Sequence, residues 1–410
     1  MAADRREREA NARMSGKREA RMRKGGERRG ERECRGGWKW DRGGGGELEE
    51  RKCEVVYIWE SLSIDASSVQ DLVSKNLETI PSRYIRPEID GEIVVTSIDN
   101  EVPVIDLSKL ILDGNKGGFS NEEMKKLHLA CQEWGFFQLV NHGVDEEAMK
   151  KMVEDVREFF ELPVELKKEC SSEIEGYGQA FVLSEEQKLD WGDMLYFSTR
   201  PDSARNYKAW PAHRPLTFRE TVNKYSSEME RMKTILVGLM AKNLGIDQGK
   251  FIDLFKDGLQ SMRLNYYPPC PDPSKVLGIS PHSDATGITI LLQLNEVDGL
   301  QIRHGGNWVP VKIIPGALLV NIGDVIEILS NGIYKSIEHR VVINKEKERI
   351  SVATFHEAHT SVLVGPLPEL IVDGETEMYR SVTSAEFLKL ILSQKLDGKS
   401  LLDNLKLKNE

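Results

Sequence analysis

The segment His282-Ser283-Asp284 places an imidazole and a carboxylate two residues apart. In an extended chain such residues point to the same side, so the two groups form a chelate for a metal ion. Two imidazoles and one carboxylate on one face of an octahedron are the ligand set of non-haem iron(II) sites. Of the eight histidines in the chain, His339 is the best third ligand. It lies in an apolar, strand-like segment, Ile337–Val341, which a β-barrel could bring opposite the first pair.

A second strand-like segment, Arg349–Phe355, makes this weak motif more specific. A lone His-x-Asp is also consistent with ordinary polar residues at strand ends, since such short motifs occur by chance. Alternation along the segment, however, puts Arg349 and Ser351 on the same face as the apolar Ala353. A guanidinium that faces a sheet core is unfavourable unless it meets an anion, and its fork geometry suits a carboxylate. The implied ligand is an acid.

The segment Ser261–Tyr267 supplies further polar groups, because Arg263, Asn265 and Tyr267 share a face. Tyr267 is predicted to donate its hydroxyl to the same carboxylate, and Asn265 to form a hydrogen bond near the metal. A structural role is equally consistent with these two residues, since tyrosines often satisfy core hydrogen bonds. Phe355, on the face of the inward arginine, is the predicted substrate contact, with a plain core role as its alternative.

Short strands broken by turns are expected to position these side chains. One strand is predicted early in the chain, at Val102–Leu107. The others follow Ser261 and are Met262–Tyr267, Ile288–Leu294, Leu300–Arg303, Trp308–Ile313, Leu318–Ile322, Ile333–Val342 and Ile350–Phe355. This number of short strands suits a double-sheet jelly roll.

The part of the chain before Ser261 has mostly helical patterning. Asp145 is placed to cap one helix, and Thr217 with Glu220 forms a capping box before a long helix that ends at Gly245. The predicted fold class is therefore α+β, with a double-stranded β-helix (jelly-roll) core, a helical N-terminal module and a C-terminal helix. That last helix is expected to begin at Thr383, where Glu386 completes a second capping box.

Three further features of the sequence are typical of structural or core residues. His142 precedes a glycine turn in the helical half and is predicted to have a structural role. Trp134 and the pair Phe136–Phe137 are predicted to be core residues rather than ligand contacts.

Charge and composition limit the classes of partner. Residues 1–52 hold 17 Lys and Arg against 11 Asp and Glu, so the remainder must carry −16 for the chain total of −10. An acidic body argues against nucleic acid as the main partner. The N-terminal stretch is low in apolar residues and is predicted to be a disordered or artefactual extension; a basic arm for RNA is the alternative.

Cysteine usage and hydropathy bear on the compartment. The five cysteines are scattered and lack C-x-x-C spacing, which favours neither a disulfide framework nor a cysteine metal site. No stretch approaches the roughly 18 apolar residues that span a bilayer. A cytoplasmic protein without a membrane partner is expected.

Five ordered motifs resemble the plant 2-oxoglutarate- and iron(II)-dependent dioxygenase superfamily. They are Asn265–Pro271 (NYYPPCP), Pro281–Asp284 (PHSD), Asn321–Asp324 (NIGD), Ser336–Arg340 (SIEHR) and Arg349–Ser351 (RIS). In the first half, Cys131–Val144 (CQEWGFFQLVNHGV) resembles the amino-terminal module of that family. Tyr177–Trp191 (YGQAFVLSEEQKLDW) is most similar to the branch of SRG-type, norcoclaurine-synthase-like and O-demethylase proteins.

The resemblance implies a specific use of the candidate residues. His282, Asp284 and His339 would hold Fe(II), while Arg349 and Ser351 would bind the far carboxylate of the co-substrate 2-oxoglutarate. With O2, the co-substrate is decarboxylated to succinate, and an unactivated C–H bond of a small plant metabolite is hydroxylated or O-demethylated. Alkaloids, flavonoids and other phenolics are the implied substrates, with ascorbate as reductant.

Two alternatives stay open, as does the oligomeric state. One is an ascorbate-using iron oxidase of the ethylene-forming type, and the other is a catalytically inactive jelly-roll binding protein. The expected organisation is an extension over 1–60, a mainly helical module over 66–250, a jelly-roll core over 258–365 and a C-terminal helical lid and tail over 366–410.

Overall fold

The computed structural model describes residues 68–407 apart from 76–78, 90–91, 96–100, 112–119, 173–174, 180–181, 183, 185, 213–214, 372–375 and 393–397. The chain divides into Met1–Cys53 and Glu54–Glu410, and all described residues belong to the second unit. The extension predicted over 1–60 lies outside the described residues. Within the described part, no helix is long and apolar enough to cross a membrane.

Two sheets form the core, and each contributes one wall of a central cavity. The large sheet has the strand order β1-β2-β10-β7-β12-β5-β4-β3, and the small sheet the order β6-β11-β8-β9. All neighbouring strands are antiparallel except the pair β1 and β2. The large sheet comprises β1 (Val104–Asp106), β2 (Phe136–Val140), β3 (Gly176–Gly178), β4 (Asp193–Arg200), β5 (Gln260–Tyr267), β7 (Ile288–Gln293), β10 (Leu318–Ile322) and β12 (Arg349–His356). The small sheet comprises β6 (Ile279–His282), β8 (Leu300–His304), β9 (Asn307–Pro310) and β11 (His339–Val341), and a separate hairpin pairs β13 (Leu363–Val364) with β14 (Val382–Thr383).

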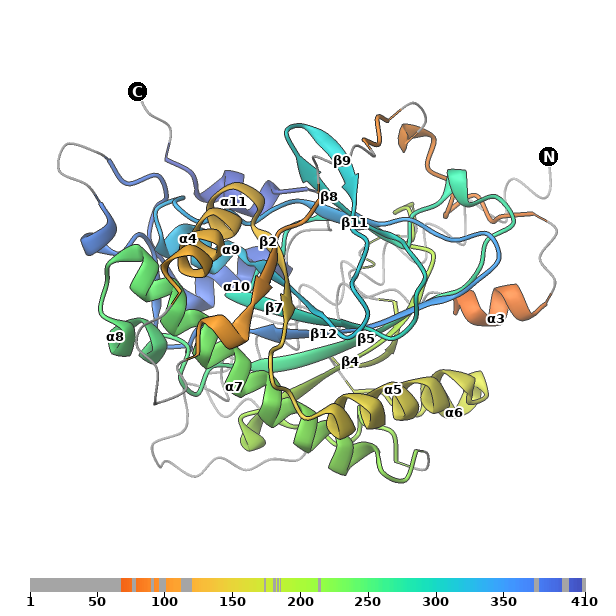
Figure 1. The fold of residues 1–410 in the computed structure, drawn as a ribbon. Coiled ribbons are helices and arrows are strands. Elements are labelled where there is room, and N and C mark those ends of the chain that lie inside the picture. The colour runs from red at the N-terminus through yellow and green to blue at the C-terminus, as the bar shows by residue number, and fades with distance from the viewer. Residues whose placement is uncertain are drawn as a thin grey trace, which may run out of the picture. The chain divides into compact units, whose positions relative to one another are not determined.

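Helices cover the face of the large sheet that points away from β8, β9 and β11 (Figure 1). The helices on this face include α5 (Glu146–Glu161) and α7 (Phe218–Leu244). The other α-helices among the described residues are α3 (Val69–Ser74), α4 (Asn121–Leu129), α6 (Val164–Lys168), α8 (Gln248–Asp253), α9 (Asp324–Leu329), α10 (Ser384–Leu392) and α11 (Ser400–Leu405). Met229 and Leu236 of α7 share one buried cluster with Leu264 of β5 and Val352 of β12. Burying this apolar layer on the outer face leaves the opposite face of the same strands for polar side chains.

The predicted α+β jelly roll is therefore confirmed. Strand Leu318–Ile322 has the predicted bounds, Asp145 caps α5 through the backbone N–H groups of Glu147 and Ala148, and α7 ends at Gly245 in the left-handed conformation. The capping box at Thr383 is also present, since Glu386 and Thr383 exchange hydrogen bonds.

Other local expectations were wrong. Thr217 makes no capping bond to α7; its hydroxyl donates instead to Asp155 of α5, so a tertiary contact wins over the local one. Of the strand expected over Ile333–Val342, only β11 forms. The first half also contains β2 and β4, two strands of the large sheet that its helical patterning did not reveal.

Gly135 directs the chain into β2, and its backbone requires glycine for two separate reasons. Its φ of +60° is unfavourable for other residues, and an added Cβ would overlap the backbone oxygen of Lys335. Gly143 has nearly the same φ, +62°, but a Cβ there meets no described atom within 4 Å. The two positions therefore separate conformational strain from steric overlap.

We expect Gly135→Ala to lower the free energy of unfolding more than Gly143→Ala does. The control should lose roughly 1 kcal/mol, from the left-handed backbone alone. Gly135→Ala should lose about 1–3 kcal/mol more, because the backbone of Lys335 must move. Urea unfolding of both variants measures the difference, and equal losses would contradict the proposed overlap.

Candidate metal centre and co-substrate pocket

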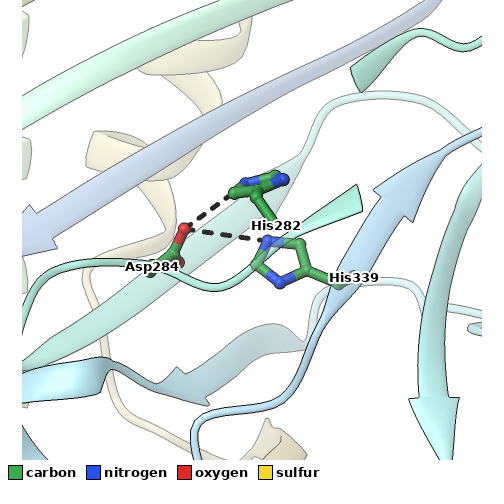
Figure 2. A group of neighbouring side chains, drawn as sticks. All are labelled: His282, Asp284 and His339. Carbon is green, nitrogen blue, oxygen red and sulfur yellow. Dashed lines mark ion pairs between the residues drawn. The ribbon is translucent and has the colours of Figure 1, made fainter. Parts of the chain in front are cut away.

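Three buried side chains converge at one end of the small sheet. His282 is the last residue of β6 and His339 the first of β11, and the two are directly paired across the strands. Oδ1 of Asp284 lies 3.5 Å from Nε2 of His282 and 3.7 Å from Nε2 of His339. Figure 2 shows both rings beside this carboxylate. Ligand atoms about 2.1 Å from an ion in neighbouring positions lie roughly 3 Å apart, so this spacing fits a metal.

Backbone contacts fix which ring nitrogen faces the centre. Nδ1 of His282 lies 2.8 Å from the carbonyl oxygen of Ser280, and Nδ1 of His339 lies 3.1 Å from that of Ile337. A carbonyl accepts only, so both Nδ1 atoms carry hydrogen and both Nε2 atoms keep a free lone pair. Burial, together with the neighbouring His282, lowers the pKa of His339 to about 4. His339 is therefore neutral near pH 7, as metal binding requires.

The carboxylate of Asp284 is oriented by two residues that the sequence interpretation gave no role. Its Oδ2 accepts hydrogen bonds from Oγ1 of Thr289 at 2.6 Å and from Nδ2 of Asn321 at 2.7 Å. Burial alone would raise the pKa of Asp284, but the imidazoles of His339 and His282 and the hydrogen bonds hold it below its usual range. One oxygen is thus fully satisfied and the other, Oδ1, is presented to the two rings.

The predicted acid-binding residues lie on the large sheet, across the same cavity. The side chain of Arg349 is 2% exposed and its Nε donates to Gln293, while Nη1 lies 3.4 Å from Oγ of Ser351. Its Nη2 is buried without a hydrogen-bond partner among the described residues. Burial lowers the pKa of Arg349 below its ordinary value. A buried guanidinium with a donor to spare fits the distal carboxylate of a dicarboxylate such as 2-oxoglutarate.

The secondary candidates also line this cavity. Asn265 lies within 3.4 Å of Oγ of Ser351, and the ring of Tyr267 lies under the guanidinium of Arg349 at 5.5 Å. Phe355 is half-buried further along β12. The described contacts include no hydrogen bond from the Tyr267 hydroxyl, so its predicted role as a donor stays a prediction.

Two more cavity residues were not assigned from the sequence. Phe136, expected in the core, is buried but also lines the cavity, with its ring 5.3 Å from that of His339. Arg263 is half-buried on β5, level with Ala353 of β12, and its Nε has no partner among the described residues. The sequence pointed to Arg263 only through its position on the same strand face as Asn265. His142 has the expected structural role, since it bonds to Gly316 and Val144.

Comparisons with known proteins agree with this geometry. The family model of the 2OG-Fe(II) oxygenase superfamily matches residues 258–358, and that of the non-haem dioxygenase in morphine synthesis N-terminal region matches residues 102–213. S-norcoclaurine synthase 1 of Coptis japonica is 48% identical over 353 residues, which cover 84% of this chain and 97% of that protein. The chain belongs to the 2OG-Fe(II) oxygenase superfamily.

Other relatives of this oxygenase extend the agreement. Codeine O-demethylase of Papaver somniferum is 44% identical over 86% of this chain and 99% of that protein. The crystal structure of JOX2 in complex with 2OG, Fe and JA has a TM-score of 0.76 at 36% identity, and covers 84% of this chain and 99% of that one. The predicted family is confirmed, and the chain is a 2-oxoglutarate-dependent non-haem iron dioxygenase that uses iron(II) and 2-oxoglutarate.

We expect Asn321→Ala to weaken iron(II) binding by about 10- to 100-fold, because a carboxylate that loses its orienting partner no longer presents Oδ1 to the two rings. Asn243→Ala is the matched control, since Asn243 bonds only to the backbone of Met124 in the described contacts. Anaerobic titration with iron(II), followed by tryptophan fluorescence, measures both affinities. If Asn321→Ala binds iron as tightly as the control, Asn321 does not orient the carboxylate.

Proposed function

We propose that His282, Asp284 and His339 hold the iron(II) of this oxygenase, and that Arg349 and Ser351 bind the distal carboxylate of 2-oxoglutarate. One observation carries the proposal: two imidazoles and a carboxylate converge on one cavity that also receives a buried arginine, whose Nη2 has no hydrogen-bond partner in the part of the chain that the structure describes. When bound, the iron supplies oxygen activation. The side chains orient the co-substrate, and the apolar walls of the cavity keep water from the reacting atoms.

The proposed reaction is hydroxylation or O-demethylation of a small plant specialised metabolite. The substrate class is an alkaloid, a flavonoid or another phenolic, and the support is the similarity to S-norcoclaurine synthase 1 and codeine O-demethylase. Ascorbate is proposed as the reductant. We also propose a cytoplasmic location, consistent with Cys131, Cys170 and Cys270, which are buried and unpaired.

An anaerobic titration tests the site assignment directly. Addition of iron(II) and then 2-oxoglutarate should produce the visible charge-transfer band of a metal-chelated 2-oxo acid, and Asp284→Ala should abolish it. We expect Arg349→Met to raise the dissociation constant of 2-oxoglutarate about 10- to 100-fold and to change iron(II) affinity little, because the guanidinium is proposed to bind the co-substrate and its described contacts are to Gln293, Ser351 and Tyr267 rather than to the iron ligands.

Absence of the band in the wild-type protein would contradict the proposed iron and co-substrate site. Turnover that needs ascorbate but not 2-oxoglutarate would instead indicate the ethylene-forming type of oxidase.

Arg263 is proposed to bind the substrate rather than the co-substrate. Arg349 is level with Tyr267 in the sheet, while Arg263 is four residues further along β5, a separation of about 13 Å at the usual rise of a strand. The backbones of the two arginines therefore lie at different levels of the strands that line the cavity. Arg263 pairs with Ala353, two residues before Phe355 on β12, and lines the same cavity, where its guanidinium is suited to an oxygen of the substrate.

We expect Arg263→Met to raise the KM for the substrate by roughly tenfold or more, because a charge-assisted hydrogen bond is lost. The affinity for 2-oxoglutarate should stay unchanged. A panel of alkaloids, methoxylated phenolics and free phenolics is first screened for succinate release to identify the substrate. The product should show a mass gain of one oxygen or the loss of a methyl group. Arg303→Met is the control, since Arg303 is exposed on β8. A KM equal to that of the control would contradict the assignment.

A further inference from the structure

The strand that carries His282, β6, lies at the edge of the small sheet. A segment near the C-terminus forms hydrogen bonds with its outer edge. Gly398 donates its N–H to the carbonyl of Pro281 at 2.9 Å and accepts from the N–H of Ser283 at 3.1 Å. These two bonds flank His282 on one side, while His339 of β11 pairs with it on the other. The backbone of this proposed ligand is therefore held from both edges.

The next residue of the segment reaches a buried carboxylate behind the site. Nζ of Lys399 lies 2.9 Å from Oε2 of Glu327, a residue of α9 that is 3% exposed. Glu327 also accepts from the backbone N–H of Ser336 and, through Oε1, from the hydroxyl of Tyr379 at 2.6 Å. Ser336 lies three residues before His339, so one carboxylate ties the C-terminal segment to the second ligand strand.

The same short helix contacts the remaining ligand. The backbone N–H of Asp324 donates to the carbonyl of Asp284 at 2.8 Å, and Oδ2 of Asp324 accepts from Oγ of Ser283 at 3.2 Å. Helix α9 thus bonds to the backbone of Asp284, to the side chain of Ser283 and, through Glu327, to the backbone of Ser336, and its two acidic residues are both buried. Lys399, the residue directly before α11, brings a positive charge to this helix. Buried carboxylates keep their hydrogen-bond geometry only when such a charge offsets them.

We propose that Gly398 and Lys399 are positioning residues of the iron centre, so that residues 398–407 fix the backbone of His282 directly and that of His339 through Glu327. The inference rests on the proposed iron ligands. It assigns to the C-terminal segment a role in metal affinity, separate from any contact with substrate. Neither residue lines the cavity, so neither is a catalytic residue.

The test compares substitutions at two lysines of this segment in the full-length chain. Lys399→Met removes the buried ion pair, and Lys399→Arg keeps the charge. Lys406→Met is the matched control, because Lys406 pairs with Asp403 at the surface. Anaerobic titration with iron(II), and with cobalt(II) as a spectroscopic probe, gives the metal dissociation constant and the visible bands of the bound ion. Thermal unfolding of the metal-free variants reports stability separately.

We expect Lys399→Met to weaken binding of both metals about 10- to 100-fold and to shift the cobalt bands, as loss of a supporting contact does in other metal sites. Lys399→Arg should recover most of the affinity, and Lys406→Met should match the wild type. Wild-type affinity and bands in Lys399→Met would overturn the inference. Failure of the wild-type protein to bind metal would instead overturn the proposed ligands.

A double variant keeps the test decisive if the single variant folds poorly. Lys399→Met with Glu327→Gln removes the charge at residue 327 that Lys399→Met alone leaves without its ion-pair partner, so the fold should recover in part while metal binding stays weak, because the contact to the C-terminal segment is still lost. Recovery of wild-type metal affinity in the double variant would show that Lys399 acts only as a counter-charge, and the positioning role would be wrong.

Discussion

The buried carboxylate of Asp284 is the constraint on which the rest of the site depends. Two hydrogen bonds satisfy its Oδ2, while its Oδ1 faces the Nε2 atoms of two imidazoles whose Nδ1 hydrogens already point to carbonyl groups. An anion and two lone pairs that face one another in a low-dielectric interior are jointly stabilised only by a cation. The local geometry therefore supports the proposed cation site, and the set of donor atoms favours iron(II) as the ion.

Each sheet contributes what the other lacks. The small sheet brings two histidines into register, but its edge strand β6 has only a short partner, and its ladder shows a register shift beside the ligands. The large sheet supplies the orienting groups, Thr289 from β7 and Asn321 from β10, and its outer face is fixed by the helices. The large sheet thus fixes the orientation of the carboxylate, because its strands supply both hydrogen-bond donors and are held by the helices on their outer face.

Features that depend on side-chain alternation within one strand could be predicted from the sequence. Features that depend on how distant strands pair could not. Alternation along β12 correctly put Arg349, Ser351 and Phe355 on the cavity face, because a paired strand has a strict period of two. The roles of Thr289 and Asn321 could not be read in this way, since both depend on how β7 and β10 align with Asp284. Strand β4 was missed for the same reason, because its pairing with β5 joins segments separated by the long helix α7. Thr217 has the residue type of a helix cap, but its hydroxyl donates a hydrogen bond to Asp155 instead of capping α7.

The arrangement on β5 and β12 separates two functions along one sheet face. At one end, Arg349 and Ser351 are proposed to bind the distal carboxylate of 2-oxoglutarate, a group that does not change with the substrate. At the other end, Arg263 and Phe355 combine a charge with an aromatic surface. Because side chains two residues apart on a strand are about 7 Å apart, a substitution at the second end alters the space for substrate without disturbing the first. A fixed co-substrate end and a variable substrate end are therefore consequences of strand geometry, which allows one set of iron ligands to serve different substrates.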